Sequence, residues 1–159
     1  MNIIIEQLTD TKSPHFRTVL DWNDDWWGHP RNRSREYVEE FMKNMLCVDK
    51  IAQTYIALND GECVGSYQLC MFDYVCRPDL YPWLINVYVA EKHRGKGICS
   101  ALMSHAKETL KKLNQSKCYL YTRHEGLYEK YDWKNIGKVK MWEKFGRPEY
   151  EYLYKLKIE

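Results

Sequence analysis

The most informative segment of this chain reads Val87-Tyr88-Val89-Ala90-Glu91-Lys92-His93-Arg94-Gly95-Lys96-Gly97-Ile98-Cys99-Ser100-Ala101-Leu102. It begins with strand-type apolar residues, passes into a basic loop with two glycines, and ends with apolar residues at helical spacing. The start of a helix leaves backbone N–H groups without partners and carries the positive end of the helix dipole. Because phosphate oxygens satisfy both, the segment predicts a strand, an anion-binding loop and a helix.

The spacing of the glycines separates this loop from two common phosphate-binding motifs. It lacks the Gly-Lys-Ser/Thr of a Walker A loop, and it does not complete the G-x-G-x-x-G fingerprint of dinucleotide-binding folds. Arg94 and Lys96 add positive charge at its rim. As a bare pattern, the loop is also compatible with a tight strand-to-helix turn that binds nothing.

Outward from this loop, strand and helix patterns alternate along the whole chain. Apolar periodicity and turn residues predict the order β-α-α-β-β-β-α-β-α-β-β, a mixed α/β arrangement. An Asp60-Gly61 turn joins the second and third strands as a hairpin. The expected strands cover 2–8, 51–58, 63–72, 83–89, 117–122, 133–145 and 149–158, and the expected helices begin near 14, 34, 98 and 125.

Composition and charge limit the possible classes of protein. The chain has 159 residues and is 45% hydrophobic, which favours one folded domain covering residues 1–159. The 24 Lys and Arg residues nearly balance 22 Asp and Glu residues, which argues against a nucleic-acid partner. The six cysteines form no C-x-x-C pair, so no metal site is expected. No basic-then-apolar leader and no long apolar run occur, so we expect a cytoplasmic protein without a membrane partner.

Two motifs in this order resemble the GNAT (Gcn5-related N-acetyltransferase) superfamily. Residues 94–99 are similar to its acetyl-CoA signature, and Leu127-Tyr128-Glu129-Lys130-Tyr131-Asp132-Trp133 is similar to its tyrosine-bearing short helix. The resemblance covers essentially the whole chain. It implies a single N-acetyltransferase domain, with a mixed sheet of about seven strands flanked by about four helices. Cys99 and Asp132 depart from the small residue and the glycine that the family usually has at these positions.

The resemblance also implies a cosubstrate and the residues that bind it. Acetyl-CoA is expected to pass its acetyl group directly to a primary amine, without an acyl-enzyme and without a metal. A bulge near 87–89 is expected to splay the fourth strand from the fifth and to free backbone N–H groups for the thioester oxygen. Tyr128 occupies the position of the acid that protonates the leaving thiolate, although a purely packing role stays open. The implied coenzyme-binding residues are Val87, Tyr88, Val89, Arg94, Gly95, Lys96, Gly97, Ile98, Cys99 and Ser100.

The amine acceptor is less constrained by the sequence. The 21–30 stretch, in which three tryptophans stand beside two adjacent aspartates, is a candidate for an aromatic and anionic acceptor pocket that holds a cationic amine by cation–π and charge contacts. The candidate substrate-binding residues are Trp26, Trp27 and Asp73. The alternative is ordinary helix packing of the tryptophans. Asp24, Asp25 and Asp73 are candidates for the general base by region alone. Exposed strand edges in a small α/β domain also suggest a homodimer.

Two further alternatives remain at this stage. The chain can also be a non-catalytic acyl-CoA-binding regulatory module that kept the loop but lost turnover. Cys99, in the first turn of a helix beside Arg94 and Lys96, can carry a thiolate stabilised by these charges, or it can be a small buried residue without special reactivity.

Overall fold

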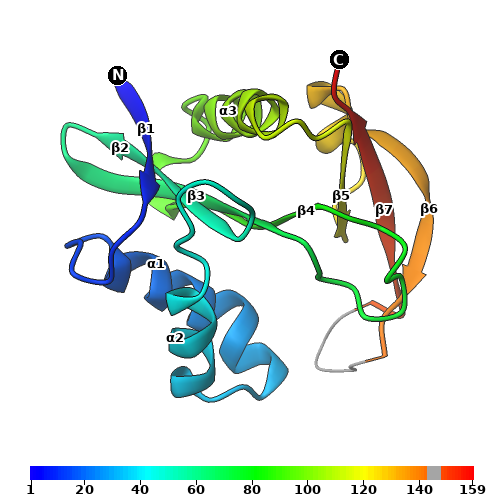
Figure 1. Cartoon of the computed structure of the whole chain (residues 1–159), viewed down its shortest axis with the longest axis horizontal. Helices are drawn as coiled ribbons and strands as arrows, with labels where there is room; N and C mark the ends of the chain where they lie inside the picture. The colour runs from blue at the N-terminus through cyan, green and yellow to red at the C-terminus, as the bar shows by residue number, and fades with distance from the viewer. Residues whose placement is uncertain (143–147) are drawn as a thin grey trace.

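The computed structural model describes residues 1–142 and 148–159, and in these ranges it contains one seven-stranded sheet with the order β1-β2-β3-β4-β5-β7-β6 (Figure 1). The pair β4–β5 is parallel and the other neighbouring pairs are antiparallel. The expected mixed sheet is confirmed. The strands are β1 Ile3–Leu8, β2 Gln53–Asn59, β3 Glu62–Cys70, β4 Trp83–Val89, β5 Lys117–Thr122, β6 Lys134–Lys140 and β7 Tyr150–Lys157.

Helices cover both faces of the sheet. In Figure 1, α1 and α2 lie on one side of β1–β4 and α3 lies on the other. The described part of the chain contains three α-helices where about four were expected, because the fourth is a single turn of 3-10 helix, η4. The bounds are α1 Phe16–Asn23, η1 Asp24–Gly28, η2 His29–Arg31, α2 Arg35–Lys43, η3 Glu91–His93, α3 Ile98–Lys112 and η4 Tyr128–Tyr131.

The ends of the elements follow local sequence signals with two exceptions. Ser34 caps α2 by accepting the Tyr37 N–H at 3.1 Å. The hairpin turn has positive φ at both Asp60 (50°) and Gly61 (80°), as an Asp-Gly turn predicts. The first exception is α1, which begins at Phe16 instead of near residue 14. The second is β6, which ends at Lys140, short of the expected 145; residues 143–145 of that prediction lie outside the described residues.

The core lies in three clusters on the two faces of the sheet. The largest packs α3 residues such as Leu102, Ala106 and Leu110 against β2–β5 and β7. A second joins α1 and α2 to β1–β3 through residues such as Leu20 and Met42. The third surrounds the fully buried Trp83 at the start of β4. In the part of the chain that the structure describes, no helix is long and apolar enough to cross a membrane.

Candidate active site

The loop between β4 and α3 has a backbone conformation that suits its two glycines. Gly95 and Gly97 have φ of 73° and 81°, in the left-handed region that favours glycine, and Gly97 is the N-cap of the 15-residue α3. A Cβ placed on either glycine meets no atom within 4 Å, so both face open space. Arg94, Lys96 and the two glycines are exposed. The first-turn N–H groups of α3 therefore open onto a basic surface that suits a phosphate group.

Beside this loop, β4 and β5 separate. Within the described residues, Trp83 opposite Tyr119 is the one registered pair between these strands. The β3–β4 register shifts between Ser66 and Gln68, where β4 has one extra residue and Asn86 adopts φ of 51°. The bulge expected near 87–89 is thus present, beginning one residue earlier. It leaves the last half of β4 without β5 as a neighbour, so this side of the strand is open to a ligand except at the Val89 carbonyl, which accepts a hydrogen bond from Arg94 Nε at 3.0 Å.

A buried chain of amides holds this bulge. The Asn86 side-chain amide donates to Gln68 Oε1 at 2.7 Å, and the amide of Asn23 in α1 donates to the same oxygen at 3.0 Å. Gln68 in turn donates to Thr54 Oγ1 at 2.9 Å. Buried amides with several partners resist rearrangement, so α1 and three strands fix the left-handed conformation of Asn86. Gln68 and Asn86 were not among the residues predicted from the sequence, although polar residues inside otherwise apolar strands were a signal for them.

Tyr128 lies at the start of η4 and is 8% exposed. Its ring packs against Trp133 and Tyr154, with centroids 6.2 Å and 5.9 Å away. Burial raises the pKa of Tyr128, and the nearby Cys99, Tyr131 and Tyr154 raise it further. The hydroxyl has no hydrogen-bond partner among residues 1–142 and 148–159, so its proton is available to a ligand. Asp132, which follows η4, adopts the left-handed conformation (φ 68°) that the family's glycine would supply.

Cys99 lies in the first turn of α3, as expected, but it packs against the core cluster between α3 and the sheet. Burial raises the pKa of its thiol, and a hydrogen bond with Tyr131 offsets this only in part. Burial therefore acts against a thiolate at Cys99, because desolvation penalises the charged form, and the structure favours the alternative of a packed residue without special reactivity.

Alkylation of the cysteines tests this conclusion. At pH 8, we expect iodoacetamide to modify Cys76, which is exposed, at least about tenfold faster than Cys99, because both the accessibility and the thiolate fraction of Cys99 are reduced. Peptide mapping by mass spectrometry at short labelling times gives the two rates. The two cysteines should react alike in the urea-unfolded protein, and Cys99 reacting first in the folded protein would contradict its half-buried position against the core.

The expected acceptor wall is only partly assembled. Trp26 is 47% exposed in the π-helical turn after α1, and its ring lies 5.9 Å from that of Tyr88. The Trp22 ring packs on the same Tyr88 ring, with centroids 4.8 Å apart, and the Arg94 guanidinium lies 5.7 Å from the centre of the Tyr88 ring. Trp26 is thus joined to the end of β4 and the basic loop. Trp27 is half-buried in the same turn.

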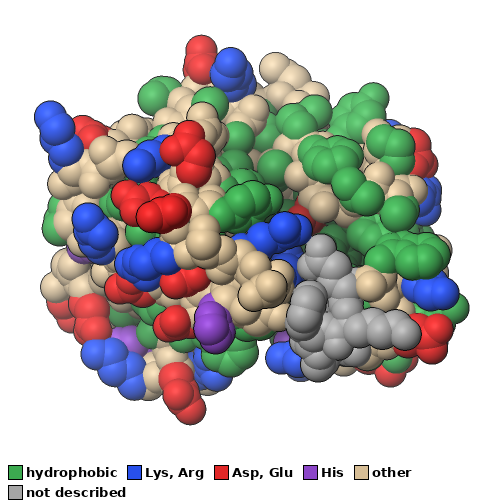
Figure 2. Space-filling model, turned by 90° about the horizontal axis from the view of Figure 1, so that it is seen from below, with side chains coloured by type: hydrophobic (Ala, Val, Ile, Leu, Met, Phe, Trp, Pro, Cys, Tyr) green, Lys and Arg blue, Asp and Glu red, His purple; other side chains and the backbone are tan. Residues whose placement is uncertain are grey.

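The carboxylates of this region do not form an acidic pocket. Asp21 and Asp24 both pair with Arg35 of α2, at 2.5 Å and 3.4 Å. Asp73 lies apart from the tryptophans in the sequence, on the 71–82 loop between β3 and β4, and its side chain already interacts within the protein. Figure 2 shows charges of both signs over the side of α1 and α2. Arg35 therefore offsets the charges of Asp21 and Asp24, and the acceptor pocket stays a prediction.

Comparisons with known proteins agree with this geometry. A model of the acetyltransferase (GNAT) family matches residues 16–146 of the chain. A search of curated proteins finds no match. In the described residues, no group of three or more His, Cys, Asp and Glu side chains is placed to hold a metal ion.

Solved structures share the fold at low sequence identity. An aminoglycoside 6'-N-acetyltransferase complexed with coenzyme A is 14% identical with a TM-score of 0.75, covering 98% of this chain and 97% of that one. A GNAT family acetyltransferase from Elizabethkingia anophelis with acetyl-CoA bound is 20% identical with a TM-score of 0.69, covering 98% of both chains. Naa50 of Arabidopsis thaliana, in complex with the bisubstrate analogue CoA-Ac-MVNAL, is 15% identical with a TM-score of 0.71, and the match covers 98% of this chain and 99% of that one.

Proposed function

The chain belongs to the acetyltransferase (GNAT) family, and on that basis we propose that it moves the acetyl group of acetyl-CoA directly to a primary amine of a small molecule or peptide. One observation carries the proposal. The open N-terminus of α3, the bulged end of β4 and the unpartnered hydroxyl of Tyr128 belong to one region. The Arg94 guanidinium before α3 lies 5.7 Å from the centre of the Tyr88 ring of β4, and Tyr128 is close enough to the α3 residue Cys99 to interact electrostatically.

The residues present fit the coenzyme. Gly95 and Gly97 leave open space where a larger residue would place a Cβ, and the α3 N–H groups with Arg94 and Lys96 would hold the pyrophosphate. The backbone of Val87, Tyr88 and Val89 would pair with the pantetheine arm as an added strand does. When bound, acetyl-CoA supplies an acetyl thioester. Ile98, Cys99 and Ser100 would contribute first-turn N–H groups, because these have no carbonyl partner within the helix.

Acyl transfer requires stabilisation of the charge on the thioester oxygen, protonation of the leaving thiolate and deprotonation of the attacking ammonium group. The chain's own groups supply the first two. Backbone N–H groups at the bulge stabilise the negative charge that develops on the thioester oxygen. As the bond between carbon and sulfur breaks, Tyr128 donates its proton to the leaving thiolate. Its raised pKa keeps that proton in place at neutral pH.

The third need is removal of a proton from the attacking ammonium group. Asp24 is a poor candidate for this base because Arg35 already pairs with it. Asp25 and Asp73 remain proposals, as does a role of Trp26 and Trp27 in the acceptor site. We also propose that residues 1–159 act as one domain in the cytosol, and that β1 or β6, the edge strands of the sheet, pair two copies as a homodimer.

Binding and turnover test the proposed function separately. Acetyl-CoA at about 100 times its Kd is expected to stabilise the fold by about 2.7 kcal/mol, which raises the Tm by about 5–10 °C in a protein of this size. Release of free CoA thiol, measured across a panel of primary amines, is expected with at least one of them. A Tm shift without thiol release from any amine would instead support the non-catalytic coenzyme-binding alternative.

A further inference from the structure

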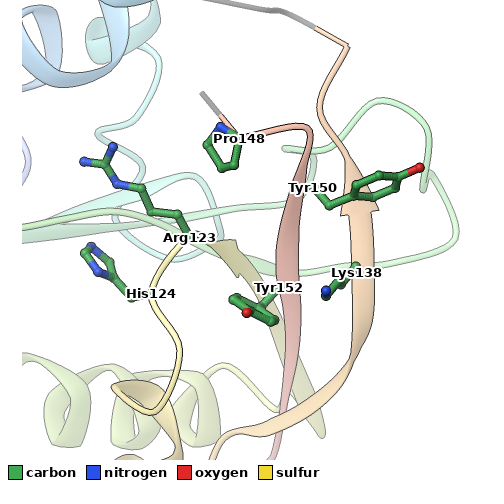
Figure 3. A pocket seen from close by; sticks show the side chains of 6 residues that line it. All are labelled: Arg123, His124, Lys138, Pro148, Tyr150 and Tyr152. Carbon is green, nitrogen blue, oxygen red and sulfur yellow. The ribbon is translucent and has the colours of Figure 1, made fainter. Parts of the chain in front are cut away.

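A cavity of about 500 Å³ opens at the C-terminal end of β5, and none of the sequence motifs pointed to it. In Figure 3, Arg123 and His124 lie on the segment after β5, Lys138 lies on β6 at the other side, and Tyr152 of β7 lies between them. Pro148 and Tyr150 complete the wall. Register explains part of this arrangement, because Lys138 stands directly opposite Tyr152 in the β6–β7 pair.

The cationic groups of the cavity have no acidic partner among the residues that the structure describes. Across the described ranges, no carboxylate pairs with Arg123, His124 or Lys138. Lys138 Nζ lies 5.3 Å from the centre of the Tyr152 ring. Glu125 accepts a hydrogen bond from the Tyr152 hydroxyl at 3.1 Å. The cavity therefore combines two permanent cations with aromatic walls, a combination that suits an anionic group.

The cavity lies close to the predicted acid. Tyr152 and Tyr154 are on the same face of β7, two residues or roughly 7 Å apart. The Tyr154 ring in turn lies 5.9 Å from that of Tyr128. A small molecule whose amine lies near Tyr128 can therefore extend its other end into the cavity.

We propose that the acceptor carries a carboxylate or phosphate besides its amine, and that Arg123 and Lys138 bind this anionic group. The inference rests on the proposed function and narrows its substrate class from primary amines in general to amines with an acidic group. It assigns recognition of the acidic group to the side of the sheet formed by β5, β6 and β7, and it leaves the proposed role of Trp26 and Trp27 in the acceptor site unchanged.

Matched pairs of amines test the proposal through turnover. Triglycine and triglycinamide differ in one carboxylate, and O-phosphoethanolamine and ethanolamine differ in one phosphate. We expect kcat/KM for thiol release to be at least about tenfold higher for the anionic member of one pair, since a charge-assisted contact is strong. Arg123→Gln and Lys138→Gln should remove that preference through KM. Lys134→Gln, the same change of charge on an exposed position of β6 outside the cavity, should keep it.

Calorimetry gives a second readout that needs no turnover. With saturating CoA filling the loop of residues 94–100, O-phosphoethanolamine and triglycine are titrated into the wild type and the three variants. The expected result is binding of at least one probe, weakened about tenfold in Arg123→Gln and Lys138→Gln and unchanged in Lys134→Gln.

Each remaining outcome has one meaning. The inference would be overturned if both members of both pairs reacted at equal rates. It would also be overturned if both probes bound equally well to the wild type, Arg123→Gln and Lys138→Gln. Either result would leave the proposed function intact. If Arg123→Gln weakens CoA about tenfold more than dephospho-CoA, the anion is the coenzyme's own phosphate, and the assignment to the acceptor is wrong. Absence of thiol release from every amine would count against the proposed function. The calorimetry would still show whether Arg123 and Lys138 bind an anionic group.

Discussion

Replacing Tyr128 with Phe is expected to lower kcat by about 10²–10⁴-fold, the usual contribution of a general acid. The ring contacts with Trp133 and Tyr154 persist in the variant, and only the hydroxyl is lost. Because that hydroxyl has no partner in residues 1–142 and 148–159, its removal leaves no buried group unpaired. We therefore expect nearly unchanged coenzyme affinity, and the effect should fall on turnover.

The matched control is Tyr131→Phe, which removes a hydroxyl from the same short turn η4. Its kcat should stay within about threefold of wild type. Since the pKa of Tyr128 is raised above the usual value near ~10, its protonated form persists throughout the range between pH 7 and 9. The rate should accordingly show no alkaline loss from this group in that range. With chemistry shown to be rate-limiting, a kcat for Tyr128→Phe within twofold of wild type would rule out the acid role and leave Tyr128 as a packing residue.

Gly97→Trp is expected to abolish the stabilisation by acetyl-CoA. Gly97 has φ of 81° at the N-cap of α3, and a side chain there enters the open space in front of the first-turn N–H groups. An indole group would cover the surface that the pyrophosphate needs. We expect the Tm shift with acetyl-CoA to fall from about 5–10 °C to nearly zero.

A second glycine controls for backbone strain. Gly61 in the β2–β3 turn has φ of 80° and nothing within 4 Å of a Cβ, so Gly61→Trp carries a similar conformational penalty, of roughly 1–2 kcal/mol, far from the loop. The Tm of both unliganded variants should fall by similar amounts, but only Gly61→Trp should still respond to acetyl-CoA. An undiminished shift in Gly97→Trp would move the coenzyme site away from residues 94–100.

Residues adjacent in the chain determined several parts of this molecule. Gly95 and Gly97 predicted a loop between a strand and a helix, Asp60-Gly61 predicted the hairpin, and apolar spacing from Ile98 onward predicted α3 to within one residue. These features depend on backbone dihedrals and on periodicities of 2 and 3.6 residues, which a short segment encodes by itself. Family resemblance then added Tyr128 and its short helix, because that motif is also local.

Tertiary structure alone decided the features that join distant segments. Gln68 Oε1 accepts hydrogen bonds from the side-chain amides of Asn86 and Asn23, which are 18 and 45 positions away in the sequence. No local sequence pattern predicts these contacts. Local sequence placed Cys99 beside two cations and a helix dipole, yet packing against the core reversed the direction of its pKa shift. The cavity between Arg123 and Lys138 likewise exists because β6 and β7 pair beside the end of β5. Burial and long-range strand pairing are properties of the whole chain, and they become readable only once the sheet is assembled.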